Sequence, residues 1–162
     1  MPPVKDVLLE VWQADAAGIY PHPEDPHAAQ AAPGFRGWGR VITDFDTGLW
    51  AFDTIKPGAV MGRNRRPMAP HINLWIVVRG INIGLNTRMY FEDEDNSADP
   101  VLGLIEQVPR RETLLARKVK PGLYRFDIRL QRNGKTVWVK IRAMRQTGVM
   151  GSGASTGVYP GG

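Results

Sequence analysis

Short apolar stretches alternate with turn-forming stretches along most of the 162-residue chain. The apolar stretches are short and clear turn signals separate them, a pattern typical of β-strands. Glycine and proline, 18 and 13 in number, are spread between them, which favours many short strands over long helices. We therefore predict an all-β fold, an antiparallel β-sandwich. The predicted strands cover residues 7–13, 40–43, 49–55, 70–79, 87–91, 124–131 and 136–142.

Two turns predict that neighbouring strands form hairpins. Residues 44–48 make an acidic turn in which Gly48 supplies a positive φ angle, and the turn separates the second and third predicted strands. Asn133-Gly134 separates the last two, and Asn-Gly is the strongest short hairpin signal. We expect each turn to pair the strands on either side of it.

Two other parts of the chain depart from the strand pattern. Residues 99–118 predict short helical or loop excursions, with one helical turn opened by Asp99-Pro100 and a second over 112–118. Residues 20–39 predict a long polar loop. Loops of this length in compact domains are usually functional or disordered.

The two ends of the chain predict an incomplete domain. Residues 1–146 are expected to form the β-sandwich, and residues 147–162, rich in glycine and serine, a disordered tail. The first strand begins almost at the N-terminus, without the strand that we expect to pair with it. We therefore expect the N-terminal part of the domain to be missing and one sheet edge to be open.

The composition argues against several classes of protein. Without cysteine the chain has neither disulfides nor thiolate metal ligands. No apolar run reaches the roughly 18–20 residues that span a bilayer, so we expect a cytoplasmic protein. The formal net charge is +5, but the basic residues are scattered and residues 92–95 are acidic, which argues against a nucleic-acid surface.

The candidate chemistry begins at His71-Ile72-Asn73, within the predicted strand 70–79. Residues two apart in a strand face the same way, so histidines at both ends of this tripeptide would offer two imidazoles to one metal ion. Asn73 puts a carboxamide in place of the second imidazole, and a carboxamide is a much poorer ligand for a transition metal. The tripeptide indicates a metal site that has lost a ligand.

Several longer stretches carry a family likeness. They are residues 8–20, 54–58, 67–73, 79–83, 87–91, 110–114 and 124–129. In this order they resemble the intradiol ring-cleaving dioxygenases, and in particular the non-catalytic α-type chains of members built from two kinds of chain. The resemblance implies that family's β-sandwich and the oxidative cleavage of an aromatic ring between two hydroxyl-bearing carbons.

The resemblance also implies what has become of the family's ferric site, which two tyrosines and two histidines hold. Tyr20 falls at the first tyrosine position and His71 at the first histidine position. Val60 falls at the second tyrosine position and Asn73 at the second histidine position. With these two replacements we expect no metal and no catalytic residue on this chain. Fe(III) would belong to a partner β-type chain in an αβ hetero-oligomer.

Arg79 is the residue to which the resemblance gives a role with substrate. In the family the arginine of this stretch helps to line the pocket whose iron belongs to the β-type chain. Its planar guanidinium suits an aromatic carboxylate. Six residues of extended strand, about 20 Å, separate it from Asn73, too far to serve a pocket around His71 of its own chain. The alternative is an ordinary strand-end arginine in a salt bridge.

Three hypotheses for the function stay open. The chain is the iron-free subunit of an intradiol enzyme, or an active intradiol enzyme that binds its own iron, or a β-sandwich binding or assembly module without a catalytic partner. Val60 and Asn73 argue against the second. A β-type partner separates the first from the third.

Overall fold

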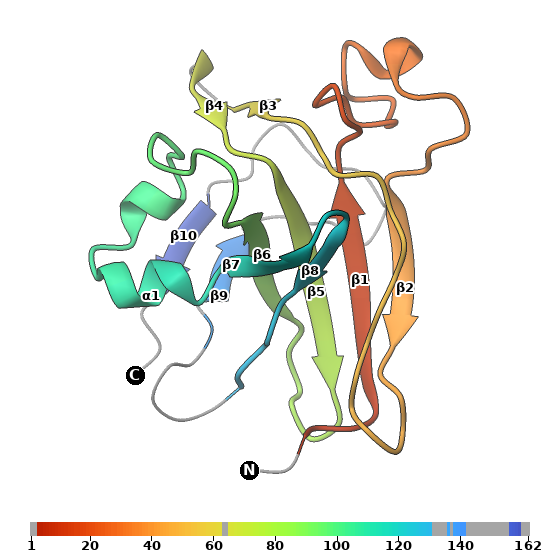
Figure 1. Cartoon of the computed structure of the whole chain (residues 1–162), viewed down its shortest axis with the longest axis vertical. Helices are drawn as coiled ribbons and strands as arrows, with labels where there is room; N and C mark the ends of the chain where they lie inside the picture. The colour runs from red at the N-terminus through yellow and green to blue at the C-terminus, as the bar shows by residue number, and fades with distance from the viewer. Residues whose placement is uncertain (1–2, 63–64, 131–135, 137, 142–155, 160–162) are drawn as a thin grey trace.

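The main element of the fold is a six-stranded sheet in the order β2-β1-β5-β6-β7-β8 (Figure 1). The computed structural model describes residues 3–62, 65–130, 136, 138–141 and 156–159. Neighbouring strands are antiparallel except β6 and β7, which are parallel. The all-β prediction is confirmed, with a mixed sheet. The strands are β1 (Val7–Gln13), β2 (Trp38–Ile42), β5 (His71–Val78), β6 (Leu85–Phe91), β7 (Leu115–Lys120) and β8 (Leu123–Arg125).

Smaller elements complete the described fold. Two short ladders pair β3 (Val60–Met61) with β4 (Pro67–Met68), and β9 (Trp138–Ile141) with β10 (Thr156–Tyr159). The helical segments are η1 (Ala28–Gln30), η3 (Leu102–Leu104) and α1 (Val108–Glu112). None of the helices in the described ranges has the length and apolar character to cross a membrane.

The main core lies on one face of the large sheet. Strand alternation places Leu9 of β1 opposite Ile76 of β5, and Ile72 of β5 opposite Met89 of β6, all buried on this face. The sheet curls so that β7 and β8 pass in front of β5 (Figure 1). Phe126, just after β8, joins the same core. The opposite face of β1, β5 and β6 therefore carries the side chains that this core does not use.

A smaller core covers that opposite face at one end of the sheet. Tyr90 of β6 is fully buried there against apolar side chains of the segment that holds η3 and α1. The buried Asp99 carboxylate fixes this segment. Its Oδ1 accepts hydrogen bonds from the Tyr90 hydroxyl and the Leu102 N–H, both at 3.0 Å, and its Oδ2 accepts one from the Ala69 N–H at 2.9 Å. The helical turn predicted at Asp99 is confirmed.

The predicted first hairpin is wrong, although its turn is right. The Gly48 N–H donates to the Asp44 carbonyl at 2.8 Å, and Gly48 has a φ of 71°. After this turn residues 49–55 are not a strand, and β2, which pairs with β1, remains the edge strand of the sheet. Trp50 and Phe52 pack against the core instead.

The second helical turn is also wrong, whereas the second hairpin is described only in part. β8 pairs with β7 and β9 with β10, while Arg129 and Thr136 are joined by two hydrogen bonds of 3.0 and 2.9 Å. The Asn-Gly turn itself lies outside the described residues. The helical turn predicted over 112–118 gives way to β7, because the chain pairs there in parallel with the end of β6.

The expectation of an unpaired first strand is wrong as well. β1 is flanked by β2 on one side and β5 on the other, so it is an interior strand of the sheet. Of the predicted tail, Thr156–Tyr159 forms β10, and residues 147–155 and 160–162 lie outside the described residues. The boundary of the domain at residue 146 stays a prediction.

Candidate functional site

The candidate site starts from two rows of side chains that cross the sheet on the face opposite the main core. In one row Trp12 of β1, Asn73 of β5 and Arg88 of β6 are cross-strand neighbours. In the next row His71 lies opposite Tyr90. Because cross-strand partners share a face, the imidazole, the carboxamide, the phenol and the guanidinium gather at one end of β5 and β6.

The loop between β1 and β2 lies at this end of the sheet (Figure 1). It carries a second phenol, that of Tyr20. The buried Asp15 carboxylate shapes the loop, because its Oδ1 accepts the Ile19 N–H at 2.9 Å and its Oδ2 accepts the Ala32 N–H at 2.8 Å. Burial acts to raise the pKa of Asp15, but these backbone donors hold it below its usual value. The Tyr20 N–H is held in turn by the Asp25 carboxylate at 2.9 Å.

Tyr20 and Asn73 touch each other. The Asn73 side chain is hydrogen-bonded to the Tyr20 hydroxyl. Burial raises the pKa of Tyr20, while the nearby Arg88 charge and the Asn73 hydrogen bond oppose the rise. Tyr20 is therefore a neutral phenol at ordinary pH. Two of the four positions that the resemblance implied as ligands are thus engaged with one another.

His71 is a buried, neutral imidazole. Its side chain is almost fully enclosed, its Nδ1 lies 2.7 Å from the Ala69 carbonyl oxygen, and its ring centroid lies 5.7 Å from that of Tyr90. Burial, helped by the Arg88 charge, lowers the pKa of His71 to about 4. A neutral ring beside a carbonyl donates from Nδ1, so Nε2 is the nitrogen left as an acceptor.

Arg88 stands at the centre of the group, and the sequence analysis did not single it out. It is 8% exposed. Its Nη1 lies 3.5 Å from the Met68 sulfur, and its guanidinium is hydrogen-bonded to the Tyr90 hydroxyl. Its Nε–H has no hydrogen-bond partner among the described residues. One signal was present in the sequence, since Arg88 is the single charged residue in the predicted strand 87–91.

Val60, the fourth implied ligand position, completes the arrangement. It is buried on β3 opposite Met68, the residue whose sulfur contacts Arg88. The structure therefore brings Tyr20, Val60, His71 and Asn73 to one end of the sheet, as the resemblance implied. What it adds is a positive charge among them.

These side chains do not fit a ferric ion. Val60 has no donor atom, the Asn73 carboxamide is engaged with Tyr20, and the Arg88 guanidinium carries a like charge. Across the described ranges, no group of three or more His, Cys, Asp and Glu side chains is placed to hold a metal ion.

Arg79 lies at the other end of β5, just beyond its last residue. Its Nη2 pairs with the Asp6 carboxylate at 2.6 Å, and its side chain is 86% exposed. The predicted separation of Arg79 from the His71 region is confirmed by the strand that lies between them. The arginine is in a salt bridge, as in the structural alternative, yet its exposure leaves the guanidinium open to a neighbouring molecule.

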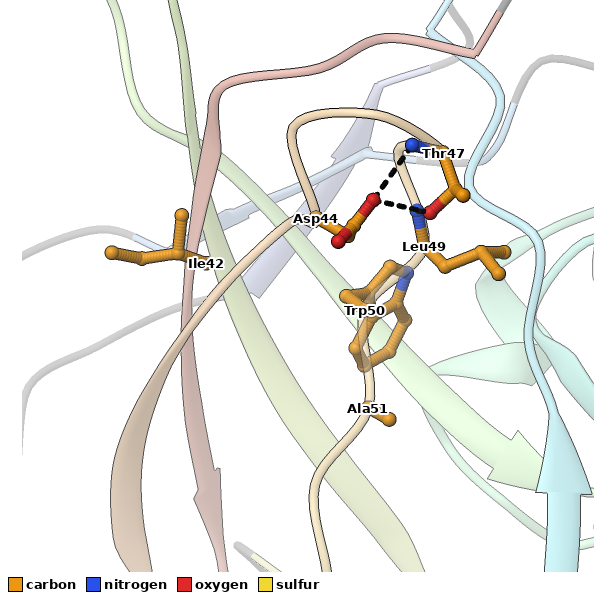
Figure 2. A pocket seen from close by; sticks show the side chains of 6 residues that line it. All are labelled: Ile42, Asp44, Thr47, Leu49, Trp50 and Ala51. Carbon is orange, nitrogen blue, oxygen red and sulfur yellow. Dashed lines mark hydrogen bonds between the residues drawn. The ribbon is translucent and has the colours of Figure 1, made fainter.

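An open pocket of about 530 Å³ lies near the turn at 44–48, towards the Arg79 end of the sheet. Figure 2 shows Trp50 and Leu49 on its wall, with Asp44 bonded to the backbone and hydroxyl of Thr47. The turn uses Oδ1 of Asp44, which accepts hydrogen bonds from the Thr47 N–H and hydroxyl. The residues that line this pocket are all from the segment 42–51, and none of them belongs to the His71 group.

Comparison of the sequence with known proteins identifies the class of protein. Residues 2–132 match the dioxygenase family, so the chain belongs to that family. It is 50% identical over 140 residues to the protocatechuate 3,4-dioxygenase alpha chain of Pseudomonas putida, covering 83% of this chain and 67% of that one. It is 40% identical over 145 residues to the alpha chain of Burkholderia cepacia, covering 85% of this chain and 70% of that one. The beta chain of Burkholderia cepacia is 43% identical over 104 residues, covering 61% and 43%.

Proposed function

We propose that this chain acts as the iron-free α subunit of a protocatechuate 3,4-dioxygenase. The observation that supports the proposal is the site itself: Val60, Asn73 and the buried Arg88 charge lie together at positions to which the resemblance assigns iron ligands or their neighbours. The names of two alpha chains to which this chain is similar support the same role. The donor set argues against the hypothesis of an active enzyme with its own iron.

In the proposed complex the chemistry belongs to a β chain related to the beta chain found by comparison. Fe(III) on that chain would serve the insertion of O₂ between the two hydroxyl-bearing carbons of protocatechuate, giving 3-carboxy-cis,cis-muconate. The present chain would shape the pocket and hold the αβ assembly. Its net charge of +5 favours an anionic substrate near the complex. We propose the cytoplasm as the place of the reaction.

Arg79 is the residue that we propose for contact with substrate in the partner's pocket. Its guanidinium is exposed at the end of β5, and its remaining N–H donors can pair with the ring carboxylate of protocatechuate. Asp6 then serves to orient the side chain before assembly.

Co-expression with a β chain tests the proposal. The two chains should co-purify at equal stoichiometry and consume O₂ on addition of protocatechuate, and the β chain expressed by itself is the control. A chain that never associates with β chains would favour the alternative, a β-sandwich binding or assembly module without a catalytic partner.

A further inference from the structure

The charge of Arg88 has no direct ion-pair partner among the described residues. The residue is 92% buried. Its direct neighbours are the Met68 sulfur at 3.5 Å and the Tyr90 hydroxyl. The buried Asp99 carboxylate reaches it only through that hydroxyl, which donates to Asp99 at 3.0 Å. Burying an unpaired charge is costly, so a guanidinium at this place calls for an explanation other than stability.

The position of the guanidinium supplies that explanation. Arg88 is the cross-strand neighbour of Asn73, which is bonded to Tyr20, and it contacts Met68, which is the cross-strand neighbour of Val60. It therefore lies among the side chains at the family's ligand positions. A fixed cation there repels any multivalent cation, and the low dielectric of a buried site strengthens the repulsion.

We infer that Arg88 stands in for the metal ion, as a built-in cation that fills the vestigial site and bars iron from it. The guanidinium also keeps the site assembled, since it links the Tyr90 hydroxyl on β6 with Met68 on β4. The inference rests on the proposed function, in which iron belongs to the β chain. Its consequence is specific: restoring ligand side chains to this chain will not restore iron while the charge at position 88 remains.

The test measures Fe(III) binding to the full chain in three variants: Asn73→His, Asn73→His with Arg88→Gln, and Asn73→His with Arg88→Lys. The first restores a third family ligand beside Tyr20 and His71. Glutamine removes the charge, and lysine keeps it. The readouts are iron per chain and the visible absorption of tyrosinate bound to iron. Near-ultraviolet circular dichroism checks that each variant is folded, and Arg88→Met replaces Arg88→Gln if the latter does not fold.

We expect only the uncharged variant to gain iron and colour, with at least about a hundredfold higher Fe(III) affinity than Asn73→His alone. The lysine variant should bind as poorly as Asn73→His. The inference would be overturned if Asn73→His bound Fe(III) equally well with Arg88 and with Arg88→Gln. A gain with lysine equal to that with glutamine would show that space, not charge, excludes the metal. Because this chain is measured without a β chain, failure of the αβ assembly would appear as a separate result.

Discussion

The exposed arginine at the end of β5 gives the sharpest test of a role in substrate binding. Replacing Arg79 with alanine removes one ion pair, to Asp6, from a side chain that is 86% exposed. Exposed pairs contribute at most about 1 kcal/mol to stability, so the variant should fold and assemble like the wild type. If the Arg79 guanidinium binds the substrate carboxylate, the variant loses a charge-assisted hydrogen bond to the substrate. The free energy of substrate binding should then weaken by about 1–3 kcal/mol. That loss corresponds to a rise in KM for protocatechuate of roughly 5- to 150-fold.

The assay is steady-state O₂ uptake by the reconstituted αβ complex, with protocatechuate and with plain catechol, which lacks the carboxylate. Arg40→Ala is the matched control, because Arg40 is also an exposed arginine in an ion pair, at 2.7 Å from Glu10. Only Arg79→Ala with protocatechuate should show the rise. Equal losses for both substrates would make Arg79 structural, and no loss for either would mean that it does not reach the pocket.

Three further predictions concern stability, measured by urea unfolding. Asp99→Asn should lower the free energy of unfolding by about 1–3 kcal/mol, because the new amide NH₂ cannot accept the buried Ala69 N–H that Oδ2 now accepts at 2.9 Å. An unchanged unfolding midpoint would contradict this hydrogen bond. His71 has a folded pKa of about 4, below its ordinary 6.5, so protonation favours the unfolded chain and stability should fall by roughly 3 kcal/mol from pH 7 to pH 4. His71→Gln should flatten that part of the profile, and an equally steep profile would refute the assignment. Gly58→Ala should lower the free energy of unfolding by about 1–3 kcal/mol, because the new Cβ would lie 2.3 Å from the Ala16 carbonyl oxygen. Gly103→Ala is the control and should lower it less, because the space around Gly103 is open. Equal losses for the two variants would count against the close approach at Gly58.

The parts of the fold that the sequence predicted well are those governed by alternation and by local turn chemistry. The strands at residues 7–13, 70–79 and 87–91 appear as β1, β5 and β6. In β1 burial alternates strictly, as expected of a strand with one core face, whereas the end of β6 is buried on both faces. The turn at 44–48 forms because its acidic residue and glycine stabilise it without help from distant residues.

The pairing of strands could not be predicted in the same way. A turn that forms locally does not decide which strand its flanks will pair with, and β2 pairs with β1, far away in sequence, in preference to residues 49–55. Likewise the parallel pairing of β7 with β6 overrides the weak helical pattern at 112–118.

The candidate site could be predicted from the sequence only in part, for the same reasons. Alternation placed His71 and Asn73 on one face of a strand, and the structure agrees. Arg88 was missed because a charged residue in a strand is ordinarily on a solvated face. Only the register between β5 and β6, together with the contact from Met68 of β4, makes it a buried charge beside Asn73.

The measurement that tests the central claim most directly is native mass spectrometry of this chain co-expressed with a β chain in iron-replete medium. The account predicts a complex with equal numbers of the two chains and one iron per αβ pair, and, on gentle dissociation, iron on the β chain alone. Two irons per pair, iron that leaves with this chain, or no complex at all would contradict it.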